Sequence, residues 1–451
     1  MVNPRILNKI FKAYDVRGEV GIELNPQIVE NIGRAFAEWL PKAGPIAVGH
    51  DMRPDSAELS QAFILGASSQ GRDIWDIGQI TSEMVYFAAG NFSLAGGAVI
   101  TASHNVGNDN GIKFCADEAK AVGLESGLAD IRNLVAKNDF RPKTQGKVIE
   151  KDITEYWISH VLSFVDIKKL KPLKIAVDAG NGMAGKIFPY LEKHLPFQVT
   201  EMYFELDGTF PNHEANPMKP ETLKDIIAAV KDKKLDAGIA FDADGDRAIL
   251  VDEQGGIVNG PLTSAILVEY FMRKFPGASI VYDVRNSQSV PELIARLGGE
   301  PVLCRAGHTP IKEMMRKNDA AFGAEASGHF YFKENWYADS GLIAALISLY
   351  ILSVSGGTLS KLRNKYQKYE MIPEMNYHVK DKQGVINKLK KIFENEIQEE
   401  VDGITVRFKN GSWFNVRPSN TESLLRLNIE AKTKEDLNQL TAKVIKIIGQ
   451  S

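Results

Sequence analysis

Three stretches of the chain share one local pattern, in which a short apolar strand runs into a turn of Gly, Asp or Asn and then into an amphipathic helix. Their strands lie at residues 45–50, 174–177 and 278–282. Units of this kind form right-handed crossovers in a mostly parallel sheet whose faces are covered by helices. The repeated pattern therefore predicts three related α/β domains.

The tail of the chain has a different order of elements: a helix near residues 384–397, three strands between 404 and 430, and a closing helix from 435. This order is typical of an α+β domain. The length of 451 residues suits three or four domains. We expect three related mixed/parallel-sheet α/β domains plus a C-terminal α+β domain around a central cleft. The predicted domains are residues 1–148, 149–254, 255–367 and 368–451.

Composition excludes several classes of protein. With 44% apolar and 25% charged residues the chain is neither disordered nor fibrous. A formal net charge of −3 supplies no long-range field that would attract nucleic acid or an anionic membrane. We therefore expect neither partner, and any anion site must be built from locally clustered donors.

Two features bear on the compartment. The first residues lack the apolar core of a signal peptide, and the most apolar run, 342–352, is too short to span a bilayer and is predicted to be a buried helix. The only cysteines, Cys115 and Cys304, are far apart in apolar segments and are predicted to be buried thiols. These features predict a cytoplasmic protein.

The first chemically suggestive segment is an apolar strand at 97–100 that leads into Ser103 and His104 and continues to Lys113. A serine at the end of a strand is exposed, and a nearby lysine or histidine can accept its proton or stabilise a phosphate on it. The alternative is an ordinary capping loop, and the residues alone leave both interpretations open.

The second segment places Asp242, Asp244 and Asp246 at alternate positions of a tight loop after the apolar run 237–241. Three such carboxylates repel one another unless a divalent cation lies among them, and oxygen ligands favour magnesium or calcium. The loop is not an EF-hand, because its glycine is misplaced and no glutamate closes it. A magnesium ion held here would keep open positions for a phosphate oxygen.

Two further segments are less specific by themselves. The sequence GAEASGH at 323–329 carries Glu325 and Ser327, which could bind vicinal sugar hydroxyls, although a structural turn explains it equally well. The sequence RPSNTES at 417–423 contains the guanidinium of Arg417, hydroxyl groups and an amide, which could all bind a phosphate dianion. An ordinary loop between strands is the alternative.

Together, TASHN, DADGDR, GAEASGH and RPSNTES resemble, in this order and across essentially the whole chain, the α-D-phosphohexomutase superfamily. The resemblance implies that Ser103 carries a phosphate and that magnesium is held by a phosphoserine oxygen and the three aspartates. It assigns hydroxyl contacts to Glu325 and Ser327, and a site role to His329. It assigns phosphate binding in the last domain, expected to act as a lid, to Arg417, Ser419, Asn420, Thr421 and Arg426.

The resemblance also implies a catalytic set. Lys113 or His308 could serve as acid or base, and Arg17 should face the active site. With Ser103, the full set comprises Lys113, His308, Arg17, His104 and Arg247. The chain departs from many members in having Val106 where they have proline, which alters the rigidity of the serine loop.

The implied reaction passes through a hexose 1,6-bisphosphate, which is also the expected activator, and takes hexose monophosphates as substrates. Ala326 favours the phosphomannomutase/phosphoglucomutase branch over phosphoglucosamine mutase, which remains an alternative. From other classes, we considered a phosphatase with an aspartate nucleophile and a non-catalytic sugar-phosphate sensor. We expect a monomer or a homodimer.

Overall fold

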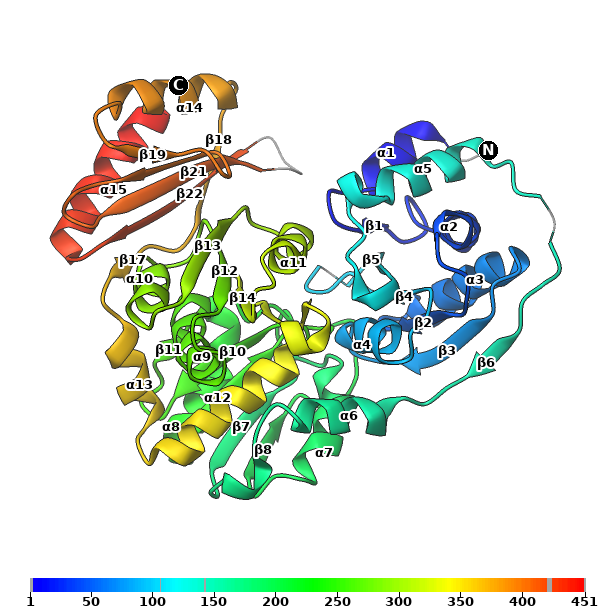
Figure 1. Ribbon diagram of the computed structural model, residues 1–451, viewed down its shortest axis with the longest axis horizontal. Coiled ribbons are helices and arrows are strands. Elements are labelled where there is room, and N and C mark those ends of the chain that lie inside the picture. Colours follow the sequence, from blue (N-terminus) through cyan, green and yellow to red (C-terminus); the bar gives the residue numbers. More distant parts are fainter. Residues whose placement is uncertain (1–2, 106, 142, 420–423, 450–451) are drawn as a thin grey trace. The chain divides into compact units, whose positions relative to one another are not determined.

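The computed structural model describes residues 3–105, 107–141, 143–419 and 424–449 (Figure 1). Its internal contacts divide the chain into two compact units. The first comprises residues 1–259 and 327–360, and the second comprises residues 260–326 and 361–451.

The first unit begins with a six-stranded mixed sheet in the order β1-β5-β4-β2-β3-β6. The central pairs are parallel, whereas β5 runs antiparallel to both β4 and β1. The strands are β1 (Val16–Glu19), β2 (Ile46–His50), β3 (Ile74–Gln79), β4 (Gly96–Ile100), β5 (Asp109–Ala116) and β6 (Val148–Glu150), and the helices are α1 (Pro4–Ile10), α2 (Pro26–Trp39), α3 (Ser56–Ser69), α4 (Glu83–Asn91) and α5 (Leu128–Lys137).

Helices cover both faces of this sheet. Side chains alternate between the faces along a strand. A Cβ at Gly96 would meet Leu40 at the end of α2, whereas one at Gly97 would meet Val85 of α4. The core between α2, α3 and the sheet includes the rings of Phe36, Phe63 and Phe114.

Helices α2 and α3 approach closely because each has a glycine at the contact. A Cβ at Gly66 would overlap the carbonyl oxygen of Glu30, and one at Gly33 would overlap that of Phe63. We expect Gly66→Ala to lower the free energy of unfolding by about 1–3 kcal/mol, because the helices must separate. Leu65→Ala, at an exposed position of α3, should change it little. Urea denaturation of both variants measures this, and equal effects would contradict the prediction.

The first unit continues with a five-stranded sheet in the order β11-β10-β9-β7-β8. Strand β7 is parallel to β8 and β9, while β9 and β10 form an antiparallel hairpin. The strands are β7 (Lys174–Asp178), β8 (Gln198–Met202), β9 (Ala237–Phe241), β10 (Ala248–Asp252) and β11 (Ile257–Val258), with α6 (Thr154–Leu162), α7 (Ala184–Glu192) and α8 (Lys224–Asp232). An antiparallel pair, β15 (Phe330–Phe332) and β16 (Ala338–Asp339), and α12 (Gly341–Ser355) complete the unit.

The apolar run 342–352 lies in α12, and most of its side chains are buried, as expected for a core helix. Among the described residues no single helix is long and apolar enough to cross a membrane. Helix α12 together with α13 (Leu359–Tyr366) meets that test by length and composition, but the two are bent by 104° at the break between them.

The second unit contains three parallel strands in the order β13-β12-β14 and a C-terminal antiparallel sheet. The first group comprises β12 (Ser279–Asp283), β13 (Glu300–Cys304), β14 (Phe322–Ala324), α9 (Gly260–Lys274), α10 (Ser289–Arg296) and α11 (His308–Lys317). The C-terminal group comprises β17 (Glu370–Met371), β18 (Met375–His378), β19 (Ile397–Glu399), β20 (Ile404–Arg407), β21 (Trp413–Pro418), β22 (Leu424–Ala431), α14 (Lys382–Ile392) and α15 (Lys434–Gly449).

The predicted fold class is confirmed: the α/β regions have mixed or parallel sheets, and the C-terminal region is a sheet with helices. Each repeated strand–turn–helix pattern forms, as β2–α3, β7–α7 and β12–α10. Cys115 and Cys304 are buried thiols, as predicted. The helix predicted at 384–397 ends earlier, at Ile392, and is followed by β19. The four domain boundaries remain a prediction.

Candidate active site

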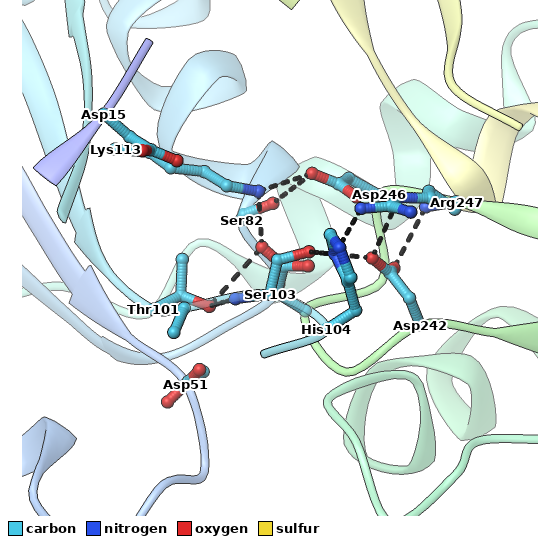
Figure 2. A network of polar contacts seen from close by, with 12 residues as sticks. Asp15, Asp51, Ser82, Thr101, Ser103, His104, Lys113, Asp242, Asp246 and Arg247 are labelled. Carbon is cyan, nitrogen blue, oxygen red and sulfur yellow. Dashed lines mark hydrogen bonds and ion pairs between the residues drawn. The ribbon is translucent and has the colours of Figure 1, made fainter. Parts of the chain in front are cut away.

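The carboxyl ends of three adjacent parallel strands, β3, β2 and β4, supply polar side chains to one edge of the first sheet. Ser82 follows β3, Asp51 follows β2, and Thr101 and Ser103 follow β4. Ligands of open α/β sheets bind at this edge. All four side chains are buried, and Figure 2 shows them with the charged groups that surround them.

Ser103 occupies an unusual backbone conformation, with φ = 50°. Its N–H donates to Thr101 Oγ1 at 2.9 Å. Arg17 donates to the carbonyl oxygen of Ala102 at 3.0 Å and to the Asn105 side chain, and its Nε is paired with Asp15. The serine loop is therefore held by contacts from outside the loop. Val106, whose departure from proline was expected to alter this loop, lies outside the described residues.

The three aspartates lie in the turn between β9 and β10, and their carboxylates come within 4.8 Å of one another. Ser103 Oγ donates to Asp242 Oδ2 at 2.9 Å, although 139 positions separate the two residues (Figure 2). Lys113, from β5, donates to Asp244 Oδ2 and Asp246 Oδ2, both at 2.6 Å. The serine, the lysine and the acidic turn thus form one buried cluster.

The charged groups of this cluster shift one another's pKa values. Burial and the charges of Asp246 and Asp244 raise the pKa of Asp242 well above its usual value. Burial also opposes ionisation of Asp246, but the charges of Lys113 and Arg247 hold its pKa well below the usual value. Burial would lower the pKa of Lys113, yet Asp244 and Asp246 raise it well above normal. The lysine is therefore a buried ammonium.

Arg247 links two histidines. It donates to His104 Nδ1 and, through Nε, to His329 Nε2 at 3.2 Å. Arginine is only a donor, so both ring nitrogens accept. Burial and the Arg247 charge lower the pKa of His104 well below its usual value, which keeps its ring neutral. His329 Nδ1 lies 3.1 Å from Ser327 Oγ and can donate to it.

The acidic turn fits a divalent cation. Its three carboxylates are buried and offer only oxygen atoms, the donors that hard cations prefer. Asp244 Oδ1 is buried and accepts no hydrogen bond from the described residues. A buried oxygen of this kind is costly unless something else contacts it, and a cation satisfies that requirement. These three aspartates could therefore hold a metal ion.

The second unit contains Glu325 and His308. Glu325 Oε1 accepts from Arg285 at 2.7 Å and from the N–H of Gly307 at 2.9 Å, and Arg285 is also paired with Asp283. These contacts hold the Glu325 carboxylate in place. His308 is the first residue of α11.

The predicted phosphate-binding residues lie in the C-terminal sheet, where Arg417 and Arg426 are opposite each other on β21 and β22. Both donate to Glu374, and Arg417 also donates to Asn428 at 2.7 Å. Ser419 is the residue after β21, and its N–H donates to the carbonyl oxygen of Leu424. Asn420 and Thr421 lie outside the described residues.

Sequence reasoning missed several residues at these sites. The Ser82 hydroxyl lies 3.4 Å from the Asp246 carboxylate, and the Ser82 backbone N–H donates to the carbonyl oxygen of Asp244. The Thr101 hydroxyl lies 3.4 Å from the Asp244 carboxylate. Glu374, which contacts both arginines of the C-terminal sheet, was also missed. The position of Ser82 just after a parallel strand was the available signal, whereas no motif surrounds Glu374.

Family models match almost the whole chain. Phosphoglucomutase/phosphomannomutase α/β/α domains I, II and III match residues 8–142, 155–256 and 259–369. The C-terminal domain of the same family matches residues 374–447.

Individual relatives agree with the family models. A protein described as phosphohexose mutases from Xanthomonas campestris pv. campestris is 40% identical over 94% of this chain and 95% of its own length. A phosphomannomutase from Vibrio cholerae is 38% identical over 94% of each chain. A crystal structure of a phosphoglucomutase/phosphomannomutase family protein from Burkholderia thailandensis superposes with a TM-score of 0.91 at 30% identity, covering 99% of this chain and 97% of its own. The chain therefore belongs to the phosphoglucomutase/phosphomannomutase family, within the α-D-phosphohexomutase superfamily, and is a phosphohexomutase.

Proposed function

We propose that the enzyme interconverts the 1-phosphate and 6-phosphate of mannose, glucose or both, through a phosphate on Ser103 and a hexose 1,6-bisphosphate. The observation that supports this proposal is the 2.9 Å contact between Ser103 Oγ and Asp242, because a serine hydroxyl lies there beside a buried acidic triad and the ammonium of Lys113. Relatives named phosphomannomutase, at 34–38% identity, support mannose as one of the sugars.

Each half of the reaction exchanges one bond for another. In the first transfer the sugar hydroxyl oxygen bonds to phosphorus while the bond from Ser103 Oγ to phosphorus breaks. The hydroxyl loses a proton, and Ser103 Oγ gains one. In the second transfer Ser103 Oγ bonds to the phosphorus of the opposite phosphate while the bond from that phosphorus to the sugar oxygen breaks. Ser103 then loses a proton, and the sugar oxygen gains one. Lys113 and His308 are the candidate proton carriers, and neither is assigned to acid or base.

The chain's cationic groups are proposed to align the phosphoryl group. The Lys113 ammonium lies 2.6 Å from two of the aspartates, while Arg17 and Arg247 contact the serine loop and His104. Magnesium, held by Asp242, Asp244, Asp246 and an oxygen of the phosphate on Ser103, would supply the main positive charge for a phosphoryl transfer. Phosphoryl transfer depends chiefly on such alignment and charge.

Substrate recognition is proposed to use two further groups. Glu325, Ser327 and His329 would bind sugar hydroxyls, and the contacts of Glu325 with Arg285 and Gly307 support an oriented carboxylate. The phosphate that is not transferred would be bound by Arg417, Ser419, Asn420, Thr421 and Arg426. The Arg417 side chain is buried, which supports a guanidinium held in one orientation. A planar guanidinium can donate two parallel hydrogen bonds to the oxygens of a phosphate.

A panel of mannose, glucose and glucosamine 1-phosphates, each with magnesium and a trace of its 1,6-bisphosphate, tests the function. We expect mannose or glucose 6-phosphate to form, with little free phosphate. Free phosphate as the main product would favour the phosphatase, and no product would favour a sensor. Higher kcat/KM for glucosamine 1-phosphate would assign the enzyme to phosphoglucosamine mutase. Phosphorus NMR distinguishes these products directly.

Arg417→Ala is expected to weaken binding of the 1-phosphate and the 6-phosphate alike, because the fork recognises phosphate and not the orientation of the ring. Loss of a charged hydrogen-bond set costs about 1.5–3 kcal/mol, or roughly a 10- to 150-fold rise in both KM values. Steady-state kinetics in the two directions measure it. Arg407→Ala is the matched control, since Arg407 lies in the same sheet and pairs with Glu399. Unchanged KM values in Arg417→Ala would contradict the role.

A further inference from the structure

The conformation of Ser103 requires support from the surrounding structure. A φ of 50° lies in the left-handed region, where a side chain meets the following carbonyl group. Such conformations persist only where neighbouring contacts hold them, and they cluster at functional sites. Thr101 and Arg17 supply part of that support on one side of the loop.

A second arginine, Arg53, contacts this loop through backbone carbonyl groups. Its guanidinium donates to the carbonyl oxygens of Ser103 and Asn105, both at 2.7 Å, and to that of Asp109 at 2.9 Å. Only 3% of Arg53 is exposed. One buried side chain therefore contacts the backbone at Ser103, at Asn105 and at the start of β5.

Arg53 is itself held on two sides. Its Nε lies 3.3 Å from Asp51 Oδ2, and Asp51 Oδ1 accepts from the backbone N–H of Arg53 at 3.0 Å and from Ser56 Oγ. The ring of Phe210 lies 5.2 Å from the guanidinium carbon, a cation–π distance. Phe210 belongs to the loop after β8, so the second sheet of the same unit helps to orient this arginine.

The contact with Ser103 also orients a peptide group. In a planar trans peptide the C=O and the following N–H point in opposite directions. Because the Ser103 carbonyl faces Arg53, the N–H of His104 is directed away from the guanidinium. Losing the contact would let this peptide rotate and would shift Ser103 Oγ from Asp242.

We propose that Arg53 is a positioning residue, which holds the backbone at and after Ser103 in the conformation from which the serine gives and receives its phosphoryl group. The inference rests on the proposed phosphoserine mechanism and adds to it a residue that acts on Ser103 through the backbone of its loop. Lysine cannot replace it, because an ammonium is a single point of charge, whereas the planar fork reaches three carbonyl groups at once.

Arg53→Lys tests the proposal, with Arg72→Lys as a matched control. Arg72 also donates to three backbone carbonyls, those of Ala37, Leu40 and Lys42, but at the end of α2. A misplacement of about 1 Å at a reacting group can cost on the order of 100-fold in rate. We therefore expect Arg53→Lys to lower kcat about 100-fold with KM for hexose phosphate within about threefold of wild type, while Arg72→Lys keeps kcat within about threefold.

Two further measurements separate positioning from a loss of stability. The rate at which glucose 1,6-bisphosphate phosphorylates Ser103, followed by intact mass, should fall in parallel with kcat in Arg53→Lys only. Thermal unfolding should shift to a similar extent in both variants. If Arg53→Lys does not fold, Phe210→Leu takes its place. This variant removes the aromatic ring next to Arg53 but keeps the Arg53 guanidinium, and it should lower kcat about tenfold.

Equal kcat values in the Arg53 variant and the Arg72 control would overturn the proposal, as would a rise in KM with kcat unchanged. If Arg53→Lys does not fold, a wild-type kcat in the Phe210→Leu variant would overturn the proposal. These outcomes differ from a failure of the proposed function, because in that case the wild-type enzyme would not become phosphorylated on Ser103 by the bisphosphate.

Discussion

Replacing Ser103 with alanine is expected to abolish phosphorylation of the protein and turnover together. The hydroxyl is the only part removed, and without it no phosphate can be stored between the two transfers. We expect kcat to fall by roughly 10⁴-fold or more, a scale typical of removing a covalent nucleophile. Intact mass after incubation with glucose 1,6-bisphosphate, together with the rate of 6-phosphate formation, measures both effects.

Ser82→Ala is the control for this experiment. Ser82 is also buried and lies 3.4 Å from Asp246, so it shares the surroundings of Ser103 without its contact to Asp242. The Ser82 variant should still gain one phosphate. A phosphate that persisted in Ser103→Ala and disappeared in Ser82→Ala would transfer the acceptor role to Ser82 and refute the assignment.

Asp244→Asn is expected to weaken binding of divalent metal and to reduce turnover at a fixed magnesium concentration. The substitution keeps the shape of the side chain but removes one of three negative charges. A bound divalent cation is worth several kcal/mol of charge stabilisation in the transition state, so a loss on the order of 10³-fold is expected. Isothermal titration with Mg²⁺ measures the binding, and kinetics with and without EDTA measure the effect on rate.

Asp252→Asn provides the matched comparison. Asp252 is a buried carboxylate at the end of β10, and its Oδ1 accepts from the N–H groups of Gln254 and Gly256 in the following turn. Its substitution should affect stability without changing magnesium affinity. Wild-type activity in excess EDTA, unchanged by added magnesium, would show that no divalent ion is essential.

Local patterns in the sequence were sufficient for the fold class and for the candidate metal ligands, whereas the candidate nucleophile was assigned through the resemblance to the α-D-phosphohexomutase superfamily. Strand–turn–helix units are encoded by short-range periodicity and turn residues, so β2–α3, β7–α7 and β12–α10 could be predicted without knowing their neighbours. The spacing of Asp242, Asp244 and Asp246 likewise indicated a site for a divalent cation. Their convergence in one buried cluster agrees with that expectation.

The partners of these residues could not be predicted in the same way. Lys113 bridges Asp244 and Asp246 across more than 130 positions, and Arg53 reaches carbonyl groups about 50 positions away. Such contacts depend on strand order, in which β2 lies between β3 and β4, and a local pattern does not specify that order. Glu374 was missed for the same reason, since its two arginine partners come from β21 and β22.

The sequence by itself determined which residue types were available for phosphoryl transfer and the type of local structure that presents them. Only the tertiary structure decided which of them meet: Ser103 with Asp242, Lys113 with two aspartates, and Arg53 with the backbone of the serine loop. The physical reason is that hydrogen bonds and ion pairs depend on distance in space. That distance is set by the packing of strands and helices distant in sequence, whereas motifs record only neighbours along the chain.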